Sequence, residues 1–479
     1  MEAWLEDSGA DGLDKVEVAD FPLTTGRGVR AKCDLNKGDK ILTIPAPCLW
    51  TIKRARNDEL FGTVLKCVPR QMSVDETLAL YILFVRSRPD HLPYKNLQKH
   101  IAALPQSYTA SVFFEKNELA VLVGSSLHQL TANAQAQIEN DYLTFQTLFQ
   151  EHPTLFQEKR FSIEEYKWAL CTIWSRGMDF VVDGEPVRLL APFADMLNHS
   201  PDVQEQCHRL IKESGNLFVI ASRDYKAGDQ VFINYHYFPG RPDLSKLPNH
   251  RLLYLYGFVL PSNPDDSYEL ALQTGPGALR YAEKEKLWAR AGLTAVSTIP
   301  LTVEEPLPSK ILQYLRIQRL EYFESMTEQE ADEQILHYLI AYFTETLAGF
   351  GSPREDLEER LGNGTYATGS NSWAAAHVSA SEQRILELAK GKAAKLLGEN
   401  AAAAQQAAMQ RAEKMLAALR AGDDGEVDAP PPDRCVQCGK DGAAAKLMMC
   451  GKCKAVKYCG RHCQVVDRQK HKKVCSVKK

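Results

Sequence analysis

Residues 435–475 constrain the folding of this chain more than any other stretch. Seven of the twelve cysteines lie there, in Cys-x2-Cys and Cys-x3-Cys spacings followed by a His-x3-Cys pair. Thiolate and imidazole groups at such short spacings are typical ligands of tetrahedral zinc, and eight of them suit two ions. The candidate ligands are Cys435, Cys438, Cys450, Cys453, Cys459, Cys463, His471 and Cys475. The alternative is a disulfide framework, which would require an oxidising compartment.

The remainder of the sequence does not indicate an oxidising compartment. The N-terminal stretch MEAWLEDSGADGLDKVE is acidic and has no apolar core, unlike a secretory signal or a transit peptide. No run of about 18 uncharged apolar residues occurs, so we expect no transmembrane helix and no membrane partner. The other five cysteines are scattered singly, as buried small hydrophobic residues are. We therefore expect an intracellular protein, in the cytoplasm, the nucleus or both.

Charge divides the chain into an acidic body and a basic end. From Arg434 onward there are 13 Lys and Arg residues against 2 Asp and Glu, out of totals of 57 and 61. A basic module can bind nucleic acid by neutralising phosphates, but zinc-bound thiolates would offset part of this charge. Nucleic acid is therefore not the partner that we favour.

Hydrophobic patterning divides the rest into strand-rich and helical stretches. Residues 17–50 and 181–260 alternate apolar and polar residues between glycine turns, as short strands do. Residues 55–175 and 280–420 have helical spacing, and Ser73 with Glu76 and Ser162 with Glu165 predict two capping boxes.

One turn pattern occurs twice. Residues 216–235 predict two strands joined by a turn at 226–229, and the segment RDYKAGDQVF there repeats the pattern of CDLNKGDKIL in the N-terminal region. We interpret this echo as a sign of a compact fold of small sheets. The acidic, proline-rich stretch 421–433 predicts a linker.

Five short motifs are the candidates for chemistry: TGRGVR, WSRG, FADMLNHS, VFINY and LYGF. No Gly-x-Gly-x-x-Gly follows a strand, and neither a phosphate-binding loop nor a nucleophile elbow is present. The sequence thus lacks the usual signatures of dinucleotide binding, of nucleotide triphosphate binding and of α/β-hydrolases.

In this order the motifs resemble a SET-domain methyltransferase, in the branch of the Rubisco large-subunit and actin-histidine methyltransferases, over roughly residues 15–400. The resemblance implies an α+β fold. Small curved sheets would occupy 15–262, with a helical insert at about 55–175, and an all-α substrate-binding domain would occupy 263–420.

The segments CVQCG, CGKCKAVKYCGRHCQ and HKKVC resemble a MYND finger over 435–475. This resemblance implies two interleaved structural zinc sites and a short peptide as ligand. One site would hold Cys435, Cys438, Cys459 and Cys463, and the other would hold Cys450, Cys453, His471 and Cys475.

The resemblance also implies a cofactor, S-adenosylmethionine, and assigns residues to it. Tyr235 matches the catalytic tyrosine, and Tyr256, Gly257 and Phe258 match the segment that closes the pocket. The residues that match cofactor contacts are Gly26, Arg27, Gly28, Arg176, Asp195, Asn198, His199 and Tyr235. Missing side chains at the two glycines would let backbone approach the ligand.

The function implied is protein N-methylation, with the substrate protein bound through the helical C-terminal domain. Gly177 and Met178 follow Arg176, where histidine-methylating members have polar residues, so we favour lysine of a non-histone protein. The alternatives are a protein-histidine methyltransferase, a catalytically weak scaffold, and a transcription-associated regulator that uses the basic module.

Overall fold

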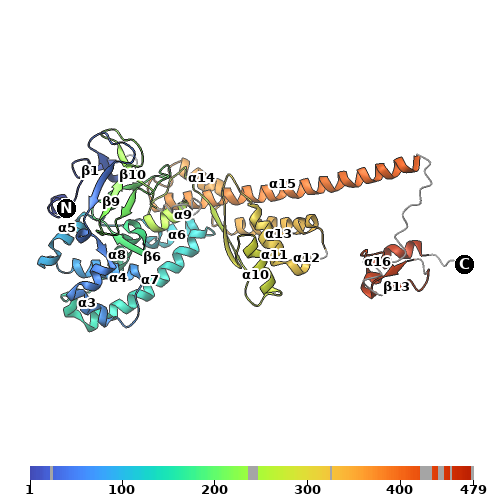
Figure 1. Ribbon diagram of the computed structural model, residues 1–479, viewed down its shortest axis with the longest axis horizontal. Helices are drawn as coiled ribbons and strands as arrows, with labels where there is room; N and C mark the ends of the chain where they lie inside the picture. Colours follow the sequence, from blue (N-terminus) through green and yellow to red (C-terminus); the bar gives the residue numbers. More distant parts are fainter. Residues whose placement is uncertain are drawn as a thin grey trace. The chain divides into compact units, whose positions relative to one another are not determined.

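The computed structural model describes residues 1–21, 25–235, 246–323, 326–420, 434–440, 447–453 and 456–475. The chain divides into two compact units, Met1–Gly398 and Glu399–Lys479 (Figure 1). The predicted linker 421–433 lies outside the described residues.

Three small sheets form the centre of the first unit. The largest has the order β1-β2-β10-β7, in which β10 pairs parallel to β7 and the other pairs are antiparallel. Its strands are β1 Val16–Phe21, β2 Gly26–Ala31, β7 Asn198–His199 and β10 Gln230–Ile233. Segments about 200 residues apart in the sequence therefore lie side by side, as the blue and green strands in Figure 1 show.

The two other sheets each have three strands and complete the predicted set of small sheets. One contains β3 Lys40–Ile44, β9 Leu217–Ile220 and β8 His208–Leu210. The other contains β4 Trp50–Thr51, β6 Glu185–Leu190 and β5 Met178–Val182. The fold is thus of the α+β class with small sheets, as predicted.

The two echoing turns pack against each other with near two-fold symmetry. Leu35 and Tyr225 exchange backbone hydrogen bonds, each of 2.9 Å. Asp34 accepts a hydrogen bond from the backbone N–H of Ala227 at 3.0 Å, and Asp224 accepts one from that of Lys37 at 2.7 Å. Because each turn caps the other, the strands β9 and β10 that flank the second turn lie in different sheets and do not form a local hairpin.

Helices between the sheets form the predicted insert. They are α2 Ile52–Asn57, α3 Glu59–Cys67, α4 Val74–Arg86, α5 Lys95–Ala103, α6 Lys116–Leu122, α7 Ser126–Glu151 and α8 Ile163–Arg176, after a short N-terminal α1, Glu2–Asp7. Both predicted capping boxes are present, at the start of α4 and of α8. Each box satisfies backbone N–H groups that have no partner inside the helix.

The region 263–420, predicted to be all-α, is mainly helical but has a pair of strands in addition. Its helices are α10 Tyr281–Arg290, α11 Ser309–Gln318, α12 Leu320–Phe323, α13 Glu328–Ala348, α14 Arg354–Gly362 and α15 Asn371–Arg420. The addition is the antiparallel pair of β11, Tyr268–Gln273, and β12, Val296–Leu301. Leu270 of β11 and Ile299 and Leu301 of β12 are buried in a core of their own with α10, α11 and α13, which explains why these segments are extended.

The finger in the second unit has little regular structure. It contains β13 Met448–Met449, β14 Lys457–Tyr458 and the helix α16 Arg461–Val474. Among its described residues, those that are buried are three cysteines and Tyr458, which is too little apolar surface for an independent core. None of the described helices, in either unit, is both long enough and apolar enough to span a membrane.

Candidate functional site

A cavity of about 580 Å³ lies where the largest sheet meets the helical insert and the end of α8. Five of the eight residues matched to cofactor contacts line it, and these are Arg27, Arg176, Asp195, Asn198 and Tyr235. Cavities of roughly 300–1,000 Å³ are the usual size for small-molecule and cofactor sites. The structure thus brings together residues that are up to about 200 positions apart.

The strand β2 forms one wall of this cavity, and its glycines have a steric reason. Asn198 donates a hydrogen bond from Nδ2 to the carbonyl of Arg27 at 3.1 Å. A Cβ atom at Gly28 would lie 2.7 Å from that Nδ2 and 2.4 Å from Gln230 Nε2. Gly26 has a φ of +67°, a left-handed conformation that favours glycine. The cavity lining does not include Gly26, Gly28 or His199, although all three were matched to cofactor contacts. The two glycines support the wall from behind.

The segment 195–199 forms the adjoining wall and holds Tyr235. The backbone N–H of Tyr235 donates to His199 Nδ1 at 3.3 Å, and the Tyr235 hydroxyl donates to the carbonyl of Leu197 at 3.0 Å. Just before this segment, Phe193 has a φ of +72°. A buried non-glycine residue in that conformation is strained, so the surrounding contacts must hold the segment in place.

Opposite charges meet at this wall. Arg176 donates from Nη1 to the carbonyl of Asp195 at 2.8 Å, and the same atom lies 3.7 Å from the Asp195 carboxylate. Burial opposes ionisation of Asp195, but its contact with His100 and the charge of Arg176 outweigh it and lower the pKa of the carboxyl. Among the described residues, Asp195 Oδ1 and Arg176 Nε have no hydrogen-bond partner. The Asp195 side chain is fully buried, whereas that of Arg176 is partly exposed, so the guanidinium is the charged group of this pair that a ligand can reach.

Tyr235 stands where the large cavity meets a second, narrow one. The narrow cavity has a volume of about 20 Å³ and shares Ser175, Arg176, Asp195, Tyr235 and Tyr256 with the large one. Its remaining wall consists of Gly177, Met178, Leu197, His208 and Ile233. Burial raises the pKa of Tyr235 to about 12, so the phenol is neutral at physiological pH. The hydroxyl can orient a reacting group at this junction but is a poor source of negative charge.

The pocket-closing segment lies where the sequence placed it. Tyr256 and Phe258 line the large cavity, and the rings of Tyr256 and Tyr235 are 4.7 Å apart. Tyr256 ends a short π-helical turn, η7 Leu252–Tyr256, that follows α9 Asn249–Arg251. Gly257 has a φ of +77°, and a Cβ atom there would lie 2.8 Å from the backbone nitrogen of Ala110. Only glycine suits this close approach.

Sequence reasoning missed one wall of the cavity, the segment 104–109 that follows α5. Leu104, Pro105, Gln106, Ser107, Tyr108 and Thr109 all line it. Thr109 Oγ1 donates to the carbonyl of Gly257 at 2.6 Å, and Trp168 Nε1 donates to that of Pro105 at 2.8 Å. The only local signal was a polar, proline-containing break within an otherwise helical stretch.

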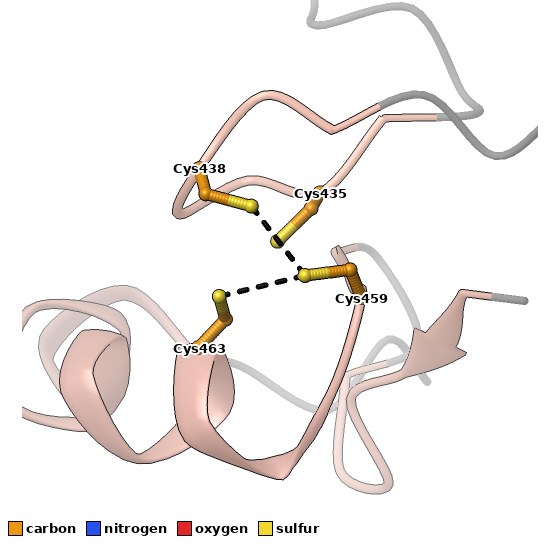
Figure 2. Close-up of side chains that lie close together, drawn as sticks. All are labelled: Cys435, Cys438, Cys459 and Cys463. Carbon is orange, nitrogen blue, oxygen red and sulfur yellow. Dashed lines mark hydrogen bonds between the residues drawn. The ribbon is translucent and has the colours of Figure 1, made fainter. Parts of the chain in front are cut away.

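The finger contains two sets of four potential metal ligands. In the first, Cys435 and Cys438 come from a loop, Cys459 follows β14, and Cys463 lies in α16 (Figure 2). The sulfur of Cys459 lies 3.4 Å from that of Cys438 and 3.5 Å from that of Cys463. Four thiols that converge on one point match a tetrahedral zinc site in number and type.

The second set contains Cys450, Cys453, His471 and Cys475. Cys453 Sγ lies 3.2 Å from His471 Nε2, and Cys450 Sγ lies 3.9 Å from Cys475 Sγ. The backbone N–H groups of Cys453 and Lys452 lower the pKa of the Cys450 thiol, whereas burial raises the pKa of the Cys475 thiol. The two sets interleave along the chain in the way that the resemblance implied.

Three family models match the chain. The SET domain model matches residues 26–236, the Rubisco LSMT substrate-binding model matches 276–386, and the MYND finger model matches 435–475.

Curated relatives are named actin-histidine N-methyltransferase. That of Danio rerio is 28% identical over 352 residues, which cover 71% of this chain and 55% of the relative. That of Mus musculus is 26% identical over 339 residues, which cover 70% of this chain and 53% of the relative. The chain spans about half the length of these relatives.

Solved structures with a similar fold are of Rubisco LSMT. The SET domain of LSMT bound to lysine and AdoHcy is 22% identical with a TM-score of 0.68, over 83% of this chain and 91% of that one. Rubisco LSMT bound to AdoMet is also 22% identical with a TM-score of 0.68, over 83% of this chain and 92% of that one. The first unit therefore has the LSMT SET fold.

Proposed function

We propose that this chain, which carries a SET domain, a substrate-binding domain of the Rubisco LSMT type and a MYND finger, is an S-adenosylmethionine-dependent protein methyltransferase. The observation that carries the proposal is the junction of a large and a narrow cavity at Tyr235, with Arg176 and Asp195 in the shared wall. Two reactants that enter from opposite sides would meet there.

The large cavity suits S-adenosylmethionine, which supplies an electrophilic methyl group when bound. The amino-acid end of this cofactor carries one ammonium and one carboxylate. The partly exposed guanidinium of Arg176 would attract the carboxylate, and Asp195, whose side chain is fully buried, lines the same wall. Asn198 would hold the same end of the cofactor, since its side chain also lines the cavity. Arg27 and the segment 104–109 would enclose the rest of the ligand.

The narrow cavity suits the reacting end of a target side chain. A lysine amine has an ordinary pKa of about 10.4 and must lose its proton before it can attack. Met178, Leu197 and Ile233 form the apolar part of the wall of this cavity, and desolvation against them favours the neutral amine. The neutral hydroxyl of Tyr235 would orient the amine toward the large cavity, which supplies the alignment that such a displacement needs.

Lysine is the target that we favour. Gly177 and Met178, which line the narrow cavity, offer no polar side chain to an imidazole ring. Histidine is the second candidate, because the curated relatives are named actin-histidine N-methyltransferase.

Partner binding is divided between the helical C-terminal domain and the finger in this proposal. Residues 263–420 would bind the substrate protein, since the substrate-binding model matches 276–386 within them. The finger would bind two structural zinc ions and a short peptide, through exposed apolar residues such as Met449, Val465 and Val466. An intracellular site of action, in the cytoplasm, the nucleus or both, fits these partners.

Methylation of a cell lysate with labelled S-adenosylmethionine tests the proposal. The full chain should label one or a few proteins, and mass spectrometry of the product should find the methyl group on lysine. Tyr235→Phe, run in parallel, identifies contaminating activity. Label on histidine would favour the second candidate, and no label above that of a lysate without added protein would favour a scaffold whose working part is the finger.

A further inference from the structure

His100 is a buried histidine of the helical insert that contacts the cavity wall from behind. It lies in the last turn of α5, on the buried face that also carries Leu97 and Ile101, and its side chain is fully buried. Its Nε2 lies 3.0 Å from Asp195 Oδ2. His100 lines neither cavity, so any effect on a ligand must pass through Asp195.

Asp195 in turn begins the segment that carries the site. Its backbone carbonyl accepts the hydrogen bond from Arg176, and Leu197 and Asn198 follow within three residues. The Leu197 carbonyl accepts the bond from the Tyr235 hydroxyl, and the Asn198 side chain bonds to β2 at Arg27. A shift of Asp195 would therefore move contacts to Arg176, Tyr235 and Arg27 together.

The same turn of α5 also holds the facing wall. Arg27 donates from Nη2 to the carbonyl of Ala103 at 2.6 Å. The end of this helix thus bonds to both β2 and the segment 195–199, and the missed wall at 104–109 begins directly after it.

A buried carboxylate needs such a partner. An ionised carboxyl without compensating hydrogen bonds is costly in a protein interior, and it responds by moving or by taking up a proton. The Asp195 side chain is fully buried, and the Arg176 guanidinium lies 3.7 Å from it, beyond hydrogen-bond distance. His100 is the side chain that donates directly to this carboxylate, whenever Nε2 carries the proton.

We propose that His100 is a positioning residue, which holds Asp195 and through it the segment 195–199 in the geometry that binds the cofactor. The strained Phe193 at the start of this segment supports the proposal, because strain persists only where neighbouring contacts oppose its release. The inference rests on the proposed function for its ligand, but the positioning itself can be measured without one.

Cofactor affinity in full-length variants is the first test. Calorimetry with S-adenosylhomocysteine should show His100→Phe binding at least tenfold more weakly than wild type. His100→Gln places a donor near the position of Nε2 and should stay within about threefold. Asp195→Asn should weaken binding to a similar degree, and adding His100→Phe to it should cause little further loss, because His100 acts through Asp195.

His250 provides the matched control. It too is a buried histidine beside a buried carboxylate, with Nδ1 3.7 Å from Glu382, and it lines neither cavity. His250→Phe should lower thermal stability and leave the affinity for S-adenosylhomocysteine unchanged. If His100→Phe does not fold, His100→Asn replaces it, since asparagine is polar but too short to reach Asp195.

Hydrogen exchange in the ligand-free protein separates the two proposals. Amides of 193–199 should exchange faster in His100→Phe than in wild type or His100→Gln. Unchanged exchange there, wild-type affinity in His100→Phe, or additive losses in the double variant would overturn the positioning role. A wild-type protein that bound no S-adenosylhomocysteine would instead overturn the proposed function, and the exchange data would still decide the role of His100.

Discussion

Replacing Tyr235 by phenylalanine removes one hydroxyl group from the junction of the two cavities. That hydroxyl donates to the buried Leu197 carbonyl at 3.0 Å, and both groups are neutral. A hydrogen bond of this kind contributes about 1 kcal/mol to the free energy of unfolding. The loss of stability should therefore be small, with a fall of only a few degrees in the melting temperature.

The loss of turnover should be much larger. Removal of one preorganised polar group from a reacting centre commonly lowers kcat by about 10²- to 10³-fold, or about 2.7–4 kcal/mol. Affinity for S-adenosylmethionine should change little, because the charged wall at Arg176 and Asp195 is untouched. The three measurements are turnover of labelled cofactor, calorimetric affinity and the melting temperature.

Tyr225→Phe is the matched control for this prediction. Tyr225 is buried, its hydroxyl bonds to Ser222 Oγ at 2.7 Å, and it lines neither cavity. It should lose a similar amount of stability and keep wild-type turnover. Turnover of Tyr235→Phe within about twofold of wild type would refute the reasoning, and Tyr256, which lines both cavities, would become the next candidate.

Three further predictions concern the cofactor wall, pH and the finger. Asn198→Ala should weaken S-adenosylmethionine binding by about 1–3 kcal/mol, and equal affinities by calorimetry would remove Asn198 from the site. Burial raises the pKa of Glu382 to about 7 from 4.5, so its contribution to stability is present below pH 4.5 and is lost as pH rises through 7. Denaturation at pH 5 and pH 8 should show a smaller pH dependence in Glu382→Gln, by up to about 3 kcal/mol, and an identical dependence would contradict the burial argument. Metal analysis should find two zinc ions in the full chain and none in a protein that ends at Ala421, which should still bind S-adenosylmethionine. Zinc in the truncated protein, or loss of its cofactor affinity, would contradict the separation of the two units.

Several parts of the molecule follow from the sequence alone because their interactions are local. All hydrogen bonds of a capping box lie within four consecutive residues. The starts of α4 and α8 could therefore be predicted from Ser73 with Glu76 and from Ser162 with Glu165. The ligand spacings of the finger are also short. Each donor pair comes from one turn of chain, so the presence of a metal module could be predicted before any packing was known.

The motifs of the cavity could be located in the sequence, but their chemistry could not be worked out from it. Arg27, Arg176, Asn198 and Tyr235 were assigned by resemblance, and the structure supplies the distances that relate them. The steric need for Gly28 and Gly257 likewise depends on Asn198 and Ala110, which approach from distant parts of the chain.

Tertiary structure alone decided the contacts that join distant segments. The strands β9 and β10 have the alternation of a hairpin, yet each pairs with an N-terminal strand because the two turns cap each other. His100 has the helical spacing of an ordinary core residue, and only packing sets it against Asp195. Hydrophobic periodicity reports that a residue is buried, whereas the identity of its partner depends on the arrangement of the whole fold.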